Sequence, residues 1–188
     1  MQPPLLIVPG LGGSGPDHWQ SIWQERLGAT RFQPASWERP DRADWLAALR
    51  AAVDACPAPP VLVAHSLGCH AVADLLHAAP GSAAGALLVA PPDLDRADAP
   101  EEVRSFRPAR RQPLDVPAVL VASEDDPYAA LPALSRLALD WRVPLIDVGP
   151  LGHVNAESGI GGWPEGRALL DDLLAAVRPE GPVLPPRR

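Results

Sequence analysis

The sequence predicts an α/β fold: a three-layer α/β/α sandwich with a mainly parallel central sheet of about six strands. Short apolar runs rich in Val, Leu and Ile alternate along the 188 residues with longer segments whose apolar residues recur at helical spacing. Such alternation is typical of parallel strands joined by helices that cover both faces of the sheet. The length suits one domain. We therefore expect a single domain over residues 1–178 and a disordered tail over residues 179–188.

The expected strands are the short apolar runs. They lie at residues 5–8, 32–37, 61–64, 86–90, 118–122 and 143–148. Pro34 weakens the second run, because proline cannot donate a ladder hydrogen bond. The third run follows a proline-rich breaker and suits a strand buried on both faces.

The expected helices fill the intervals between the strands. They lie at 17–28 with Asp17 as N-cap, at 41–54, from Ser66 to just before Pro80, up to about Trp141, and at 164–177. The polar segment 93–115 holds at most one short helix, at 100–106. It is too short for a large cap domain, so we expect a compact fold with this segment beside the substrate.

The charge balance excludes two classes of partner. The chain has 16 basic residues, all Arg, and 23 acidic residues, which give a net charge of −7 without blocks of like charge. This balance argues against nucleic acid and an anionic membrane as main partners. No leader and no run long enough to span a membrane are visible, so we expect a cytoplasmic protein.

The cysteines and histidines give no sign of a metal site. Cys56 and Cys69 flank an expected strand, which should hold them too far apart for a disulfide, so we expect two free thiols. The five histidines form no recognisable metal signature. We expect no metal and no cofactor.

A serine lies at the sharp change from the third strand to a helix. Ala64-His65-Ser66-Leu67-Gly68 resembles the nucleophile elbow G-x-S-x-G, with one extra methyl group where the first glycine usually stands. Ser66 is therefore a candidate nucleophile. On this motif alone, a helix N-cap is an equally good interpretation.

A serine nucleophile needs a base, and His153 is the best candidate. It follows the last expected strand and Gly152, at the sheet edge where the carboxyl ends of parallel strands meet. His65 adjoins Ser66 and should point away from it, while His70 and His77 lie within the next helix. We expect structural or surface roles for these three histidines.

The acid that orients the base is expected after the fifth strand. We favour Asp126, which precedes Pro127 at a turn, over Asp125, and Asp93 or Asp95 is a weaker alternative. The order Ser66, Asp126, His153 is the one found in α/β-hydrolases. Three such residues after three separate strands favour catalysis over a cap.

Two backbone amides are expected to form the oxyanion hole. Leu67 follows the nucleophile, and Leu11 lies in the glycine-rich loop after the first strand. Trp19 and Trp163, with the segment 93–115, are candidate walls of the acyl pocket, although aromatics at this spacing more often belong to the core.

The glycine-rich loop also supports a rival function. Gly10, Gly12 and Gly15 satisfy G-x-G-x-x-G, and Glu38 lies near the position of a ribose-binding acid. A dinucleotide-binding protein is therefore an alternative. It is weakened because the helix starts beyond the third glycine and because the three triad residues stay unexplained.

Four motifs resemble those of a known family. Ile7 to Ser14 with His18-Trp19, then Ala64 to Gly68, Ser123 to Tyr128 and Gly152 to Asn155 are similar to the small serine hydrolases of the retinoblastoma-binding-protein-9 and bacterial YdeN type. The resemblance covers nearly the whole chain except the tail. It implies a capless α/β-hydrolase with Ser66 as nucleophile, Asp126 as acid and His153 as base.

We therefore expect hydrolysis of a small ester, or of a thioester or amide, through an acyl-enzyme. A non-catalytic interaction module on the same scaffold is the alternative from another class. Binding to a pocket protein is not expected, because the nearest match to L-x-C-x-E, Leu67 to Ala71, lacks the glutamate. The sequence makes no prediction about the oligomeric state.

Overall fold

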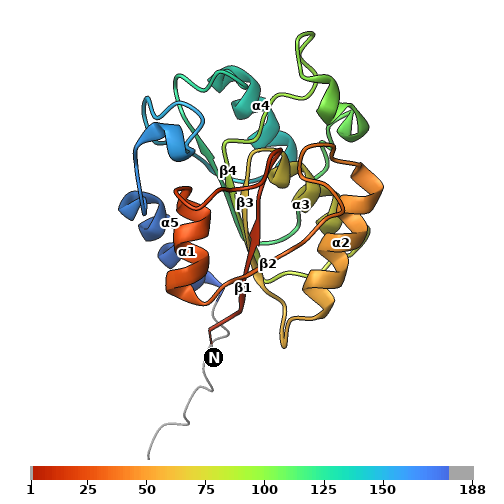
Figure 1. The fold of residues 1–188 in the computed structure, drawn as a ribbon, viewed down its shortest axis with the longest axis vertical. Coiled ribbons are helices and arrows are strands. Elements are labelled where there is room, and N and C mark those ends of the chain that lie inside the picture. Colours follow the sequence, from red (N-terminus) through yellow and green to blue (C-terminus); the bar gives the residue numbers. More distant parts are fainter. Residues whose placement is uncertain (1, 178–188) are drawn as a thin grey trace, which may run out of the picture.

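The central feature is one sheet of six parallel strands (Figure 1). The computed structural model describes residues 2–177, so the predicted tail at 179–188 lies outside the described residues. The strands are β1 Leu5–Val8, β2 Thr30–Arg31, β3 Val61–His65, β4 Gly85–Val89, β5 Ala118–Ala122 and β6 Leu145–Asp147. Their order across the sheet is β2-β1-β3-β4-β5-β6, and every pair is parallel. The predicted sandwich with about six strands is confirmed.

Within residues 2–177, five α-helices cover the two faces of the sheet. They are α1 Trp19–Leu27, α2 Arg42–Asp54, α3 Leu67–Ala78, α4 Leu131–Trp141 and α5 Pro164–Ala176. One hydrophobic cluster joins α2, α3 and α4 to one face, and a second joins α1 and α5 to the other. Figure 1 shows α1 and α5 on the opposite side of the sheet from α2 and α3. The result is the three-layer arrangement that the alternation of elements predicts.

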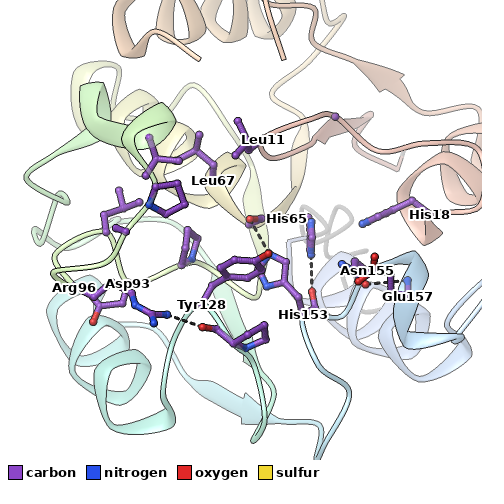
Figure 2. Close-up of a pocket in the computed structure, with 18 of the residues that line it drawn as sticks. Leu11, His18, His65, Leu67, Asp93, Arg96, Tyr128, His153, Asn155 and Glu157 are labelled. Atoms are coloured by element: carbon purple, nitrogen blue, oxygen red, sulfur yellow. Dashed lines mark hydrogen bonds between the residues drawn. The ribbon is translucent and has the colours of Figure 1, made fainter. Parts of the chain in front are cut away.

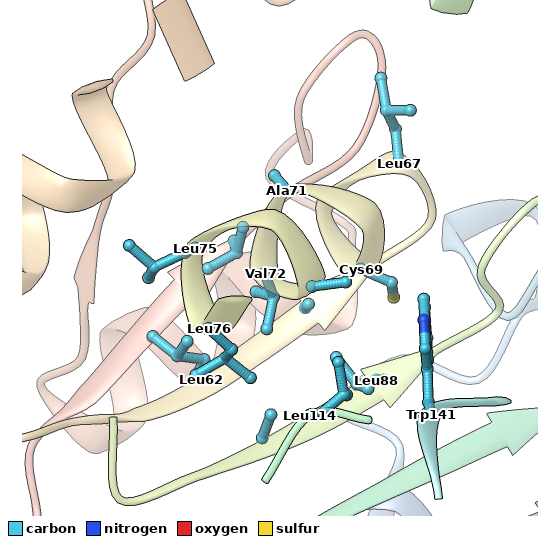
Figure 3. Close-up of a cluster of buried hydrophobic side chains, with 14 of the residues drawn as sticks. Leu62, Leu67, Cys69, Ala71, Val72, Leu75, Leu76, Leu88, Leu114 and Trp141 are labelled. Atoms are coloured by element: carbon cyan, nitrogen blue, oxygen red, sulfur yellow. The ribbon is translucent and has the colours of Figure 1, made fainter. Parts of the chain in front are cut away.

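The centre of the sheet and α3 form the densest part of the core. All five residues of β3 and of β4 are buried, as expected for central parallel strands covered on both faces. In Figure 3 the apolar side chains of α3, among them Val72 and Leu76, lie over Leu62 of β3 and Leu88 of β4. β3, which ends one residue before Ser66, is therefore covered on both faces.

The second strand differs from the prediction. It pairs through Thr30 and Arg31, whereas 32–37 is an irregular segment. Phe32 is fully buried and packs edge to face against Trp37 and Trp45. The apolar signal at 32–37 therefore comes from an aromatic cluster under an edge strand, not from strand pairing.

The start of α1 also differs. His18 is the N-cap, and its side chain accepts a hydrogen bond from the amide of Gln20. The expected cap, Asp17, lies one residue earlier and is exposed. An imidazole nitrogen thus replaces the carboxylate oxygen as acceptor for the first turn.

The segment between β4 and β5 contains a short 3₁₀ helix, Glu101–Phe106, as predicted. A buried carboxylate holds this segment onto the fold. Asp74 of α3 accepts from Nε of Arg42 at 2.7 Å and from Nε of Arg110 at 2.9 Å, and its side chain is 4% exposed. One acid thereby joins α2, α3 and the end of the segment.

Two further observations concern predictions made above. Cys56 and Cys69 are both free thiols, and burial raises the pKa of the Cys69 thiol. Over residues 2–177, no helix combines the length and apolar character that crossing a membrane would require.

Candidate active site

Three side chains from three strand ends meet in one hydrogen-bonded chain. Ser66 follows β3, Asp126 follows β5, and His153 follows β6. The Ser66 hydroxyl donates to Nε2 of His153 at 2.9 Å, and Nδ1–H of His153 donates to both carboxylate oxygens of Asp126 at 3.0 and 2.9 Å. The side chains of Asp126 and His153 are 0% and 9% exposed. Figure 2 shows His153 at the centre of the cavity.

The backbone at Ser66 forms a strained turn. Its φ and ψ are 55° and −128°, a combination that non-glycine residues rarely adopt. Ser66 occupies the N-cap position of α3, but its side chain makes no hydrogen bond to the helix, so a capping role for its hydroxyl is wrong. Strain at this position turns the hydroxyl towards His153, as in a nucleophile elbow.

Small residues make the turn possible, but they are not equivalent. A Cβ on Gly68 would lie 2.5 Å from the carbonyl oxygen of Pro9 and closer still to that of Val8. Position 68 therefore requires glycine. Ala64 carries its methyl group into the hydrophobic core and is fully buried there, so the departure from the usual motif is accommodated.

The structure separates the candidate acids. Asp126 is hydrogen-bonded to His153, whereas Asp125 accepts hydrogen bonds from the Gly152 amide and the Ser123 hydroxyl. These bonds lower the pKa of Asp125, the Gly152 amide contributing most. Asp95 pairs with Arg111, away from His153.

The two predicted oxyanion amides lie on segments that meet beside Ser66. A Cβ on Gly10 would lie 3.1 Å from the Leu67 amide nitrogen, so the chain just before Leu11 passes directly over the start of α3. Neither amide donates a hydrogen bond to another described residue. Both residues line the cavity.

A cavity of about 530 Å³ opens over Ser66 and His153. Its lining mixes apolar and polar residues. The apolar ones include Leu67, Pro92, Leu94, Pro100 and Val103. The polar ones include His18, His65, Asp93, Arg96, Asp98, Asn155 and Glu157. In Figure 2 His18, Asn155 and Glu157 lie to the right of His153, and Leu67, Asp93 and Arg96 lie to its left.

Trp19 and Trp163 do not line this cavity, so their assignment to the pocket is wrong. They are 0% and 1% exposed and pack edge to face, with ring centroids 5.2 Å apart. Their cluster lies between α1, α5 and the sheet. The cavity wall is supplied instead by the segment 92–103 and by Tyr128.

Sequence reasoning missed the place of His65. Its side chain lines the cavity beside the base, and its Nε2–H donates to the His153 carbonyl oxygen at 2.8 Å. The rings of His65 and His153 have centroids 4.8 Å apart. Burial lowers the pKa of His65 well below the ordinary value, with smaller contributions from His153 and His18. The one signal in the sequence for a place in the site was that His65 directly precedes Ser66.

The geometry of the glycine-rich loop does not support the dinucleotide alternative. Gly10 is packed against Ser66, and α1 begins at Trp19, four residues after Gly15. A pyrophosphate site would need the helix to open within the motif. Among residues 2–177, no group of three or more His, Cys, Asp or Glu is placed to hold a metal ion.

Comparison with known proteins agrees with this geometry. The model of a family described as serine hydrolase matches residues 5–172. The chain belongs to this serine hydrolase family. The predicted similarity of this chain to YdeN-type serine hydrolases is confirmed by the structural comparisons that follow.

Solved structures place this serine hydrolase among related folds. A protein described as a YdeN-like hydrolase from Pectobacterium atrosepticum is 31% identical, with a TM-score of 0.85 over 95% of this chain and 94% of that one. The ydeN gene product of Bacillus subtilis is 21% identical, with a TM-score of 0.69 over 92% and 99%. A Bacillus cereus carboxylesterase, 15% identical over 94% and 89%, has a TM-score of 0.60 and shares the fold. The comparison with curated proteins found no match.

Proposed function

We propose that this serine hydrolase cleaves small esters through a triad of Ser66, His153 and Asp126. One observation carries the proposal: the continuous hydrogen-bonded chain from the Ser66 hydroxyl through His153 to Asp126 opens into a cavity. A serine hydroxyl is a weak nucleophile until a neighbouring base removes its proton. The arrangement supplies both the base and the group that keeps it in the required tautomer.

The proposed reaction has two steps. His153 Nε2 takes the Ser66 proton as Oγ attacks the ester carbonyl, and the same proton passes to the departing alcohol as the acyl-enzyme forms. Water then attacks the acyl group with His153 again as base, and the acid and free Ser66 are released. The amides of Leu11 and Leu67 hold the oxyanion, while Asp126 stabilises the charged form of His153.

The cavity supports a small substrate with one apolar part. Its apolar lining residues, among them Leu67, Leu94 and Val103, would contact a short acyl or alcohol group. An ester is favoured over an amide, because amide resonance strengthens the bond to be broken. On the sequence grounds given above, we also propose the cytoplasm as the location.

Labelling with a fluorophosphonate probe tests the proposal. Wild type should form a covalent adduct, and Ser66→Ala should form none. Tryptic mapping of the adduct to Ser66, followed by p-nitrophenyl esters of graded chain length, identifies the nucleophile and the acyl preference. A folded wild type that neither reacts with the probe nor cleaves any ester would overturn the proposal.

A further inference from the structure

The loop that carries His153 has an unusual backbone. Gly152 and Val154, on either side of the base, have φ values of 56° and 48°. Positive φ is a genuine outlier for a β-branched residue such as Val154, so this backbone is strained. Such a loop keeps its shape only where surrounding contacts hold it.

Side chains from other parts of the fold hold four consecutive residues of this loop. The Leu151 amide donates to Ser123 Oγ at 2.9 Å as well as to the Gly149 carbonyl oxygen, and the Gly152 amide donates to Asp125 Oδ1 at 2.7 Å. The carbonyl oxygen of His153 accepts from His65 Nε2 at 2.8 Å, and that of Val154 accepts from Trp19 Nε1 at 2.8 Å. Of these four side-chain hydrogen bonds, the one from His65 is made to His153 itself.

The side chain of His65 is itself fixed. It is 5% exposed, and its ring packs against the ring of His18 with centroids 4.7 Å apart at 64°. His18 is anchored in turn, because its Nδ1 accepts from the Gln20 amide. Figure 2 shows His65 beside the backbone of His153, with His18 farther to the right. The ring of His65, which donates to the His153 carbonyl oxygen, is therefore held by buried contacts that extend to His18, the N-cap of α1.

The charge states of His18 and His65 are compatible with a protonated His153. Burial lowers the pKa of His18 to about 4 and that of His65 well below its ordinary value. Both rings are thus neutral near neutral pH, and neither opposes the positive charge that His153 gains when it takes a proton. A neutral imidazole still offers the Nε2–H that the carbonyl oxygen needs.

We propose that His65 is a positioning residue that holds the backbone of His153 so that Nε2 stays within reach of Ser66. The proposal rests on the proposed function, because it assumes that His153 acts as the base. His65 joins two parts of the site directly: it precedes the nucleophile in the chain and holds the base through space. A displacement of the base by about 1 Å can cost roughly 10²-fold in rate.

Three variants test the proposal. His65→Phe keeps a ring but removes the donor, His65→Gln replaces the donor with an amide N–H, and His77→Phe is the same change at an exposed histidine of α3. We expect His65→Phe to lower kcat for p-nitrophenyl acetate about 10²-fold, with KM within about twofold. His65→Gln should recover at least about tenfold of that loss, and His77→Phe should match wild type. The rate of fluorophosphonate labelling should follow kcat.

The outcomes separate this inference from the proposed function. An unreactive wild type overturns both, whereas a reactive wild type with an equally reactive His65→Phe overturns the positioning role alone. If His65→Phe does not fold, His65→Asn replaces it, because its shorter side chain cannot span the distance to the His153 carbonyl. Equal kcat values for His65→Gln and the variant without the donor would also overturn the role.

Discussion

A methyl group on Gly10 would lie 2.7 Å from the Cβ of Ser66. The glycine-rich loop and the nucleophile are therefore packed without space for any side chain between them. Gly15, in the same loop, has no atom within 4 Å of the position where a Cβ would stand. Within one G-x-G-x-x-G pattern, close packing thus requires glycine at position 10 but not at position 15.

Gly10→Ala is expected to impair catalysis. The added methyl group must push Ser66 or the Leu11 amide away, and a displacement of about 1 Å corresponds to roughly 10²-fold in kcat/KM. Gly15→Ala is the matched control and should stay within about threefold of wild type. Ester hydrolysis by both variants gives the comparison. Equal activity would contradict the close packing described here.

Asp126→Asn and Asp125→Asn are expected to differ strongly. An amide at 126 cannot stabilise a charged His153 and favours the wrong tautomer, so kcat should fall by about 10³-fold or more. Asp125→Asn keeps an oxygen that accepts from the Gly152 amide, so its loss should be below about tenfold. Steady-state kinetics on one ester decides the matter. A larger loss at Asp125 would reassign the acid.

Ala64→Gly restores the usual elbow motif and should cost stability rather than activity. The Ala64 methyl group is buried in the core, and glycine adds backbone freedom to the unfolded chain. The free energy of unfolding should fall by about 1–2 kcal/mol, with kcat/KM nearly unchanged. Urea unfolding and ester kinetics measure the two effects. A marked gain in activity would show that the extra methyl group strains the elbow.

Acid should destabilise the protein through its buried histidines. The pKa of His18 is lowered to about 4 by burial, with Arg31 and His153 adding to the effect. The unfolded chain, with a pKa near 6.5, therefore takes up protons more readily between these two values. Stability is full above about pH 6.5 and falls as the pH drops towards 4, by about 3 kcal/mol for His18 alone.

Urea unfolding at about pH 7 and about pH 4.5 checks this pH dependence. His18→Phe should show a smaller drop between the two conditions, and His77→Phe should show the same drop as wild type. His65 and His70, whose pKa values are also lowered by burial, account for the drop that remains in His18→Phe. An unchanged drop in His18→Phe would contradict a neutral, buried His18.

The cavity should discriminate against anionic esters. Asp93 and Glu157 line it, and Arg96, the arginine of its lining, is bound to Asp98 and to the Pro127 carbonyl. Repulsion between a substrate carboxylate and these acids should weaken binding of the transition state by about 1 kcal/mol, which corresponds to about fivefold in kcat/KM. The p-nitrophenyl hemisuccinate compared with the butyrate measures this difference, which should shrink as salt is added. Faster cleavage of the anionic ester would contradict the expectation.

Most of the fold could be predicted because its central strands carry a strong local signal. β3, β4 and β5 are short apolar runs, and the structure places them within one residue of the predicted bounds. β2 has no such signal, since an edge strand of two residues, Thr30 and Arg31, buries little. The neighbouring Phe32 is apolar for a different reason, namely the aromatic cluster with Trp37 and Trp45.

The positions of the proposed triad residues could also be predicted, because parallel strands bring their carboxyl ends to one edge. The surroundings of the triad could not. Strand alternation places His65 opposite Ser66, but the strained turn and the folded-back loop of residues 151–154 put it beside the base. Trp19 and Trp163 lie in segments next to the site, and only their packing against each other shows that they belong to the core.

The carbonyl oxygens of Val8 and Pro9 lie directly over Gly68, whereas the methyl group of Ala64 points into the core. The two ends of the Ala64–Gly68 elbow are therefore under different steric constraints. At position 64 the core accommodates a methyl group, whereas at position 68 a Cβ would collide with the backbone at the end of β1. A motif pattern that demands glycine at both ends would pass over this enzyme, and one that accepts any small first residue would find it.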